Sequence, residues 1–433
     1  MRSVLMSAKH VHLIGIGGIG ISALARLLLR EGKHISGTND SESAQTLNAL
    51  RGQGVVIGLG TDPLLLPVDA DAFVYSLAWE KNAPTLMAEA RNRGVPIFTY
   101  FEGLGDVSEA YQTIAISGTH GKTTTTAMTA TVLSACGLSP RAIVGSIVPE
   151  WESNYLHGSS AIFVVEACEY QRSFTHLTPF VLAITNIEED HLDYYKDLAD
   201  IESAFREVAE KVPRDGAIVA DMTIPSVARV VAGLSARIVD YKEFLSQVPL
   251  LKIPGEHNRK NAAVALATAH ILGISGERAQ RALESFQGTA RRFEYKGETK
   301  NGAVVFDDYA HHPSEIRATL AGAQERFPNK RIVAVFQPHL FSRTEQLFAG
   351  FVDALSRADE VVVAPIYAAR EKDPGTITSQ MVVTGIHARN PNVSYVESRD
   401  LLAQKISSYK SDSVVVVMGA GDIGEVAHRA VQN

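Results

Sequence analysis

Residues 113–125 read T-I-A-I-S-G-T-H-G-K-T-T-T, and they are the most informative segment of the chain. An apolar run ends at Ile116, a glycine loop follows, and Lys122 opens a helix-like segment that continues to Cys136. A strand, a glycine loop and a helix in this order wrap a polyphosphate with backbone N–H groups and add a lysine charge and a metal-binding hydroxyl. The alternative is a chance loop, because Ile116 stands where the general pattern has its first glycine. We predict that ATP or a close relative binds at Gly118, Thr119, His120, Gly121, Lys122, Thr123 and Thr124.

The rest of the chain alternates short β-branched runs with helical patterns, which is typical of parallel α/β sheets. The predicted strands are 10–15, 72–76, 113–117, 161–167, 181–185, 217–220, 303–306, 331–336, 360–364 and 413–418. A linker is predicted at 96–105, and a helical stretch at 261–286 precedes a second boundary near Gly288. The predicted domains are therefore 1–105, 106–288 and 289–433.

Composition limits the possible functions. A chain of 433 residues, 45% hydrophobic and 21% charged, suits two or three soluble globular domains. The formal net charge of -7 argues against a general nucleic-acid binder, which needs a basic face. Cys136 and Cys168 are the only cysteines, so a disulfide framework is excluded and a reducing compartment is favoured. No apolar run approaches the roughly 20 residues of a membrane helix, and the polar start does not read as a secretion signal. We expect a cytoplasmic protein without membrane insertion, as a monomer or homodimer.

A second glycine loop, at 15–20, matches G-x-G-x-x-G after a predicted strand and before a helix at 21–30. This context favours a nucleotide pyrophosphate at the helix N-terminus, with Asp40 as the acid that reads a ribose. A tight turn that only packs a strand against a helix is the alternative, and an NAD-dependent oxidoreductase has to be considered. A third copy of the pattern, at 419–424, lies too close to the end at Asn433 for a dinucleotide unit. We predict that it is a turn into the last helix.

Acidic residues and a histidine follow two strands beside the phosphate loop. Glu166 ends the apolar run Ile-Phe-Val-Val, and His191 follows 181–185. Ligands of open parallel sheets lie beyond the carboxyl ends of the strands, so both residues should converge on Lys122 and Thr123. Oxygen ligands suit Mg²⁺, whereas His191 could instead be a base or a phosphate contact. The intervening acids, 188–190, are predicted to form a solvated turn.

Polar residues gather again after later strands. Asn258 and Asn261 precede or open an alanine-rich helix, where they could cap the helix or bind a nucleotide base. A paired arginine at 291–292 could be a solvated turn or a phosphate clamp. Two strand ends carry D-D-Y-A-H-H-P at 307–313 and Q-P-H-L-F-S-R-T at 337–344, which suits a small zwitterion whose carboxylate pairs with an arginine.

These segments together make the chain resemble the Mur ligases, an ATP-dependent amide-forming family of peptidoglycan synthesis. The resemblance spans nearly the whole chain and rests on GIGGIGISALA, GTHGKTTT, EACE, TNIEEDHLD, HNRKNA, RRFE, DDYAHHP, FQPHLFSRT, IYAARE and MGAGDI. Within the family the chain is most similar to the members that add L-alanine to UDP-N-acetylmuramate.

The resemblance implies an α/β fold of three domains: a Rossmann-like N-terminal domain for the UDP-sugar, a central P-loop ATPase-like parallel-sheet domain for ATP, and a C-terminal Rossmann-like domain for the amino acid. It implies UDP-sugar contacts at Gly15, Gly17, Gly18, Gly20, Ser22, Asp40 and Ser76. It implies Mg²⁺ at Thr123, Glu166 and His191. It implies further ATP contacts at Asn258, Asn261, Arg292 and Asp308, and an alanine pocket at Tyr309, His311 and Arg343.

The implied reaction has two steps: the lactyl carboxylate of the muramate attacks the γ-phosphate of ATP, and the alanine amine then displaces phosphate from the acyl phosphate. Lys122, Mg²⁺ and Arg292 would neutralise charge in the first step. His191 or His311 would accept the amine proton in the second. Cys168 and Leu340 stand where related ligases often carry Asp and a second Arg. The rival functions are a recycling ligase that adds a tripeptide to the same sugar nucleotide and a non-catalytic nucleotide sensor.

Overall fold

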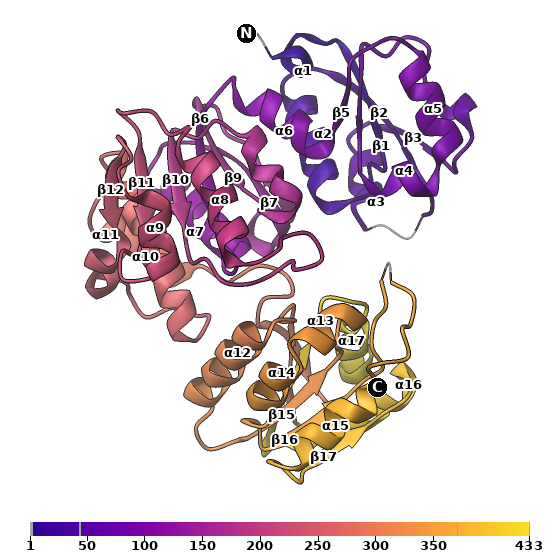
Figure 1. Cartoon of the computed structure of the whole chain (residues 1–433), viewed down its shortest axis with the longest axis vertical. Helices are drawn as coiled ribbons and strands as arrows, with labels where there is room; N and C mark the ends of the chain where they lie inside the picture. Colours follow the sequence, from indigo (N-terminus) through magenta and orange to yellow (C-terminus); the bar gives the residue numbers. More distant parts are fainter. Residues whose placement is uncertain (1–2, 43–44, 370, 433) are drawn as a thin grey trace. The chain divides into compact units, whose positions relative to one another are not determined.

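The computed structural model describes residues 3–42, 45–369 and 371–432. The chain divides into two compact units, Met1–Pro249 with Lys260–Ser285, and Leu250–Arg259 with Phe286–Asn433. The first unit contains two sheets and the second contains one, which confirms the predicted α/β fold of three domains (Figure 1).

The N-terminal sheet is parallel, with strand order β3-β2-β1-β4-β5. Its strands are β1 (His10–Ile14), β2 (His34–Asn39), β3 (Val56–Leu59), β4 (Ala72–Tyr75) and β5 (Ile97–Thr99). Its helices are α1 (Val4–Ser7), α2 (Ile19–Arg30), α3 (Gln45–Arg51), η1 (Pro63–Leu65), α4 (Ala78–Asn82), α5 (Pro84–Asn92) and α6 (Tyr100–Ser108). The linker predicted at 96–105 is wrong, because β5 pairs with β4 and a capping box at Thr99 starts α6.

The central sheet has strand order β12-β11-β10-β6-β9-β7-β8. Its strands are β6 (Gln112–Ser117), β7 (Arg141–Val148), β8 (Ser153–Leu156), β9 (Ile162–Glu166), β10 (Val181–Ile184), β11 (Ala217–Ala220) and β12 (Arg237–Asp240). Its helices are α7 (Lys122–Ala135), η2 (Pro149–Trp151), η3 (Tyr170–His176), α8 (Leu198–Ala209), α9 (Pro225–Val231), η4 (Tyr241–Gln247), α10 (Glu256–Ile271) and α11 (Glu277–Ser285). The helical stretch predicted at 261–286 is interrupted, because Gly273 and Gly276 adopt positive φ between α10 and α11.

One hydrophobic core joins the first two domains. It runs from Leu24 and Leu104 of the N-terminal domain to Phe163 and Phe205 of the central domain. Arg26 of α2 also donates a hydrogen bond of 2.9 Å to Ser153 of β8. Because this core is continuous, the two domains form a single unit.

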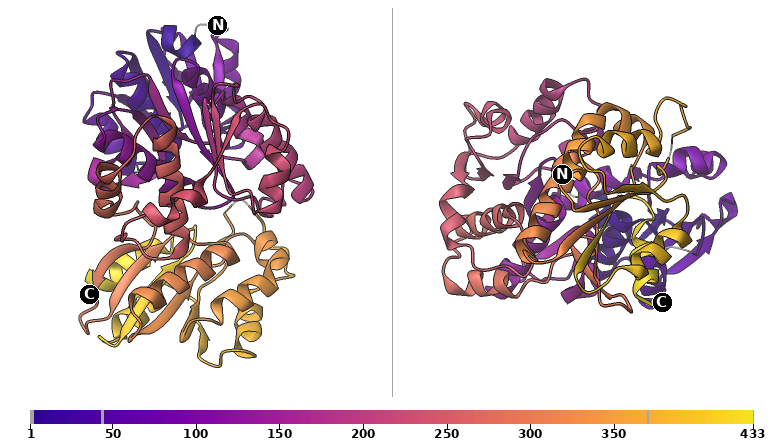
Figure 2. Two further views of the ribbon diagram at one scale, coloured as in Figure 1. Left: turned by 90° about the vertical axis from the view of Figure 1, so that its left-hand side faces the viewer. Right: turned by 90° about the horizontal axis from the view of Figure 1, so that it is seen from below.

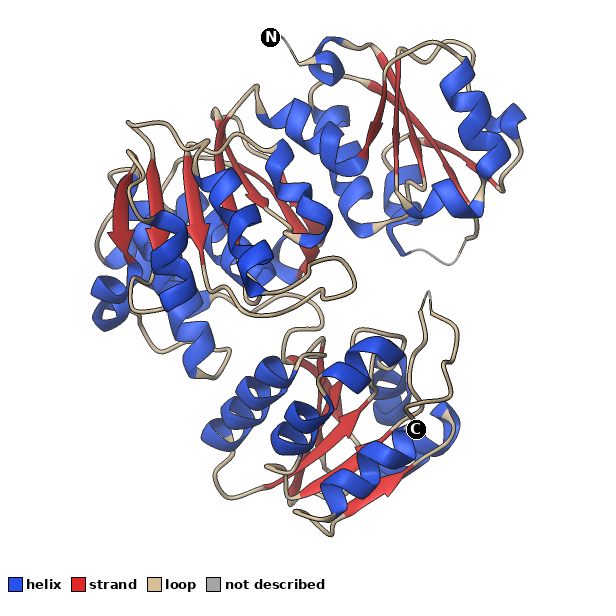
Figure 3. Cartoon of the chain, in the orientation of Figure 1, coloured by secondary structure: helices blue, strands red, loops and turns tan. Residues whose placement is uncertain are grey.

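The C-terminal sheet has strand order β13-β14-β18-β15-β16-β17. Its strands are β13 (Glu294–Glu298), β14 (Val304–Asp308), β15 (Arg331–Phe336), β16 (Glu360–Val363), β17 (Val393–Tyr395) and β18 (Ser413–Met418). Its helices are α12 (Pro313–Arg326), α13 (Phe341–Gln346), α14 (Phe348–Leu355), α15 (Ser379–His387), α16 (Arg399–Ser408) and α17 (Gly424–Gln432). Helices cover both faces of this sheet (Figures 2 and 3), since α12, α14 and α15 contribute to one core and α16 and α17 to another.

The expectation of parallel pairing is wrong at two edges, since β8 and β13 each pair antiparallel with their neighbours. All ten predicted strands are present within two residues of the predicted ends. Among the helices that the structure describes, none has the length and apolarity needed to cross a bilayer.

Candidate active site

The phosphate loop 118–121 lies at the carboxyl end of the central strand β6. Strands β9 and β10 flank β6, with Ile116 paired with Glu166 and Ser117 paired with Ile184. The structure therefore brings Glu166 to one side of the loop and Thr185 to the other, as expected for a parallel sheet.

Two residues after β10 hold the loop rigidly. Asn186 accepts a hydrogen bond of 3.0 Å from the His120 amide and donates one of 3.1 Å to the His120 carbonyl. Thr185 donates one of 2.6 Å to the same carbonyl, and a Cβ at Gly118, where φ is 134°, would overlap its Oγ1. Neither Thr185 nor Asn186 was predicted as a site residue from the sequence, although a polar pair directly after a buried strand was the available signal.

Helix α7 begins at Lys122, and the buried Thr123 and Thr124 lie in its first turn. Its N-cap is Gly121, where φ is 84° and a Cβ would lie 2.5 Å from Oδ1 of Asn261. Asn261 therefore lies against the loop, in the first unit. Asn258, in the second unit, donates a hydrogen bond of 2.7 Å to the carbonyl of Pro254 at the start of α10.

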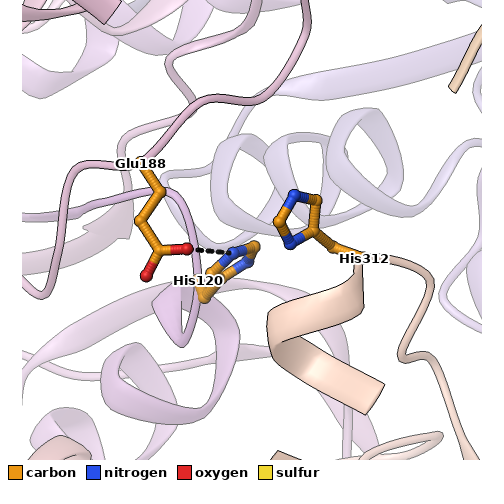
Figure 4. A group of neighbouring side chains, drawn as sticks. All are labelled: His120, Glu188 and His312. Atoms are coloured by element: carbon orange, nitrogen blue, oxygen red, sulfur yellow. Dashed lines mark ion pairs between the residues drawn. The ribbon is translucent and has the colours of Figure 1, made fainter. Parts of the chain in front are cut away.

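Figure 4 shows an ion pair between the loop and an acid of the predicted acidic turn. His120 Nε2 lies 3.6 Å from Oε2 of Glu188, and the hydroxyl of Thr119 accepts a hydrogen bond of 2.9 Å from the Glu188 amide. The third side chain drawn, His312, belongs to the second unit, where it caps α12 by accepting a hydrogen bond from Ser314.

A buried carboxylate that the sequence analysis did not assign links two of the predicted residues. Glu169 is 2% exposed, its Oε1 lies 2.9 Å from Nζ of Lys122, and the same oxygen lies 3.5 Å from Nε2 of His191. Burial raises the pKa of Glu169, but the charges of Lys122 and His191 outweigh it and hold that pKa below the ordinary value. Burial likewise lowers the pKa of Lys122, while Glu169 outweighs it and raises that pKa. The structure therefore joins Lys122 and His191 through one ionised carboxylate. In the sequence, Glu169 could have been recognised as the second acid of the E-A-C-E motif.

The solvated turn predicted at 188–190 is wrong for Asp190. This residue is 9% exposed, and its carboxylate accepts a hydrogen bond of 2.7 Å from the amide of His191. His191 has a φ of 53°, a strained value for a residue other than glycine, and its ring lies 4.7 Å from that of Tyr170. Asp190 and Tyr170 thus support the strained conformation of His191.

The donor set around the loop fits a hard divalent cation. Glu166, at the end of β9, accepts a hydrogen bond of 2.6 Å from the amide of Gly145, and Thr123 supplies a hydroxyl from the first turn of α7. A carboxylate, a hydroxyl and substrate phosphate oxygens are ligands that Mg²⁺ prefers. Cys168 is a poor addition to this set, because burial raises its pKa to about 12 and keeps the thiol protonated.

The first glycine loop follows β1 and precedes α2. Oδ1 of Asn39 accepts a hydrogen bond of 3.1 Å from the amide of Gly17, whereas Asp40 is exposed. A Cβ at Gly20 would lie 2.6 Å from the ring of Tyr100, the first residue of α6. The structure therefore places Asn39 rather than Asp40 against the loop.

The other predicted UDP-sugar residues lie near this loop. Ser76 follows β4, and its Cβ lies 3.2 Å from where Gly15 would carry one. Gly18 is the N-cap of α2, and Ser22 lies in its first turns, where it accepts a hydrogen bond of 3.0 Å from Asn154 of β8.

In the second unit, two predicted residues meet on Glu315. NH1 of Arg292 lies 3.7 Å from its carboxylate, and Nδ1 of His311 lies 3.3 Å from it. The guanidinium groups of Arg291 and Arg292 lie 5.0 and 5.1 Å from the centre of the Tyr309 ring. Tyr309 and His311 thus lie beside a pair of cations.

His339 connects this cluster to Arg343 of α13. Its ring lies 6.0 Å from that of His311, and its Nδ1 lies 3.3 Å from NH1 of Arg343. Tyr367 stacks on His339 with ring centres 5.6 Å apart. Leu340 is buried with a φ of 68°, which turns the chain sharply into α13. Arg370 of the I-Y-A-A-R-E motif lies outside the described residues.

Asp308 ends β14 and holds the adjacent turn. Its two carboxylate oxygens accept hydrogen bonds of 2.7 Å from the amides of Phe293 and Ala310. Burial raises its pKa from 3.8 to about 6. The ribose contact of Asp308 stays a prediction.

The raised pKa of Asp308 predicts a specific pH dependence of stability. Between 3.8 and about 6 the folded protein holds a proton that the unfolded chain has released, so stability falls as pH rises through this window. Asp308→Asn removes the titration, so the loss of stability between about pH 4.5 and about pH 7 should be smaller in the variant than in the wild type. Urea unfolding of both proteins at the two pH values measures this difference. An equal loss in both would contradict a raised pKa.

The chain matches three family profiles, one for each of its sheets and in the same order along the sequence. Family profiles match residues 10–112 (Mur ligase family, catalytic domain), 116–247 (Mur ligase middle domain) and 291–421 (Mur ligase, glutamate ligase domain). The chain is 37% identical to a UDP-N-acetylmuramate–L-alanine ligase of Clostridium kluyveri, over 96% of this chain and 97% of that protein. It is 36% identical to the ligase of the same name from Caldanaerobacter subterraneus subsp. tengcongensis, over 100% and 99%.

Two solved structures share the fold. A UDP-N-acetylmuramate–alanine ligase from Thermotoga maritima superposes with a TM-score of 0.80, at 29% identity over 98% of each chain. A murein peptide ligase from Psychrobacter arcticus superposes with a TM-score of 0.70, at 24% identity over 98% of each chain. Because the three profiles match most of the chain in order, and relatives match it nearly end to end, the chain belongs to the Mur ligase family.

Proposed function

We propose that this protein joins L-alanine to the lactyl carboxylate of UDP-N-acetylmuramate at the expense of ATP, giving UDP-N-acetylmuramoyl-L-alanine, ADP and phosphate. The observation that carries the proposal is the nearly full-length similarity to ligases named for this reaction. The reaction belongs to peptidoglycan synthesis, and we place it in the cytoplasm, where ATP and UDP-sugars are made.

The residues of the first unit suit the phosphoryl-transfer step. Lys122 and the N-terminus of α7 supply positive charge at the end of a parallel sheet, where phosphate oxygens are bound. Thr123, Glu166 and His191 would hold Mg²⁺, which would neutralise charge on the phosphates when bound. The carboxylate oxygen of the muramate attacks the γ-phosphorus, the bond to ADP breaks, and an acyl phosphate forms. Catalysis in this step comes from positioning and electrostatic stabilisation.

The residues of the second unit suit the amide-forming step. Arg343 is 9% exposed and can pair with the carboxylate of an amino acid. Tyr309 and His311 lie in the same cluster. The amine attacks the acyl carbon, phosphate leaves, and His191 or His311 accepts the amine proton.

Product formation from a panel of acyl acceptors, each carrying a free amine, tests the proposal. The purified protein is incubated with UDP-N-acetylmuramate, ATP and Mg²⁺, and with L-alanine, L-serine, glycine or the recycling tripeptide. Phosphate release should require all three substrates and be fastest with L-alanine. Faster turnover of the tripeptide would favour the recycling ligase. ATP binding without alanine-dependent release would indicate a nucleotide sensor. Oxygen-18 in the sugar carboxylate should appear in the released phosphate, and its absence would refute an acyl phosphate.

A further inference from the structure

The ammonium group of Lys122 already makes three hydrogen bonds within the protein. An ammonium group donates three hydrogen bonds. Nζ of Lys122 donates 2.6 Å to the carbonyl of Gly118, 3.0 Å to the carbonyl of Thr119 and 2.9 Å to Oε1 of Glu169. The first two acceptors belong to the lysine's own loop, and the third carries a full negative charge. Before this lysine can bind a phosphate oxygen, one of the three must be released.

Glu169 is the partner that a phosphate can replace. Both of its carboxylate oxygens lie 2.9 Å from Nζ, and its side chain is 3% exposed. A phosphate oxygen, like this carboxylate, is an anionic acceptor of charge-assisted hydrogen bonds. The two loop carbonyls are fixed by the backbone, which Thr185 and Asn186 hold through His120.

The carboxylate keeps a partner after such an exchange. Nε2 of His191 lies 3.5 Å from Oε1 of Glu169, on a residue whose backbone Asp190 fixes. The backbone carbonyl of Glu169 accepts a hydrogen bond from the hydroxyl of the buried Tyr195, which anchors the segment. A buried carboxylate left without any partner would be strongly destabilising, so His191 makes the exchange feasible.

We propose that Glu169 is a positioning residue of the phosphate site, which holds the place of a nucleotide phosphate on Lys122 and gives Lys122 up when the nucleotide binds. The carboxylate holds the lysine in place within the loop before the nucleotide binds, and afterwards orients His191. The assignment deepens the proposed function and rests on it only for the catalytic readout.

The proposal predicts opposite changes in nucleotide affinity and in turnover. Glu169→Gln removes the charge that competes with phosphate for Lys122, so ADP should bind about tenfold more tightly, the size of one charge-assisted hydrogen bond. The same change weakens the support of His191, so kcat should fall about 10- to 100-fold, as for other residues that orient a metal-binding histidine. If Glu169 had a merely structural role, its substitution would lower both the affinity for ADP and kcat.

Glu202→Gln is the matched control. Glu202 makes a two-pronged ion pair with Arg229, between α8 and α9 of the same unit, and its side chain is 15% exposed. The control should leave ADP affinity and kcat at wild-type values. Calorimetric titration with ADP, in the presence and absence of Mg²⁺, measures affinity without requiring ligation.

A double-mutant cycle with Lys122→Met separates exchange from simple repulsion. If Glu169 competes with phosphate for the lysine, Glu169→Gln should tighten ADP binding much less when Lys122 is already Met. If Glu169→Gln tightens ADP binding equally with Lys122 present and with Lys122→Met, the effect is charge repulsion alone and the proposed exchange on Lys122 is refuted. Unchanged or weaker ADP binding by Glu169→Gln alone would also overturn it. If Glu169→Gln alone does not fold, the double variant, which contains neither charge, is compared with Lys122→Met alone. ADP binding that is a full tenfold tighter in the double variant than in Lys122→Met would again refute the exchange.

The two hypotheses can fail separately. Tighter ADP binding by Glu169→Gln in a protein that shows no alanine-dependent phosphate release would support the role of Glu169 and refute the proposed function. Alanine-dependent release with weaker ADP binding in the variant would do the opposite.

Discussion

Lys122→Ala should abolish ligation, with kcat at least about 10³-fold lower, because it removes the charge that in the proposed function neutralises the transferring phosphate. Lys122 opens α7 at the end of the central strand, and its side chain lies within the loop that would hold the phosphates. Phosphate release with all three substrates present measures the effect. Activity near the wild-type level would refute the assignment of the phosphate loop.

The stability of this variant has to be controlled, because the substitution leaves the buried carboxylate of Glu169 without its lysine and with His191 as its remaining ionic partner. Removing one partner of a buried ion pair typically costs about 3–5 kcal/mol, and Glu169 is only 2% exposed. Lys122→Ala with Glu169→Gln should recover most of that stability, since the buried carboxylate that has lost its lysine is then replaced by a neutral amide. It should remain inactive. Thermal unfolding followed by circular dichroism distinguishes loss of the fold from loss of catalysis.

Arg343→Ala should raise the KM for alanine by about a hundredfold, because a carboxylate loses its charge-assisted hydrogen bonds. The KM for ATP should change little. The buried guanidinium of Arg343 faces His339, whose ring neighbours His311, so the substitution acts on the predicted alanine pocket. Initial rates with each substrate varied in turn provide the two KM values.

Two controls sharpen the Arg343 prediction. Arg343→Lys keeps the charge but loses the planar fork, so its KM for alanine should lie between those of the wild type and the alanine variant. Arg317→Ala removes an arginine of α12 that pairs with Asp353 on the surface, and it should leave both KM values unchanged. An equal rise of both KM values in Arg343→Ala would remove this residue from the amino-acid pocket.

The sequence predicted the strands well because burial on both faces leaves a distinct pattern. Val181–Ile184 is apolar throughout and Ser413–Met418 is apolar after its first residue, and both are interior strands of their sheets. The edge strands of the sheets were harder to predict. Glu294–Glu298 is rich in charged residues and pairs only on one side, so it carries no such pattern. Ile97–Thr99 is short and follows a proline, which made it look like a linker.

In the candidate site too, some residues could be predicted from local sequence and others could not. Lys122, Thr123 and Glu166 could be predicted from local sequence, because a glycine loop and a polar residue after an apolar strand are recognisable in one dimension. Glu169 could not be assigned in this way, since its importance comes from Lys122 and His191, which are 47 and 22 residues away along the chain. Asn39 was passed over for Asp40 because one position along a strand end decides which side chain turns inward.

The α/β class, the glycine loop after β6 and the family resemblance could be predicted from sequence, because these depend on periodicity and on short motifs whose residues are neighbours in the chain. The pairing of charges became visible only in the folded chain: Lys122 pairs with Glu169, Arg292 and His311 with Glu315, and His120 with Glu188. The physical reason is that burial and electrostatic pairing act between atoms a few ångströms apart in space, and their strength follows from the fold that brings distant segments together.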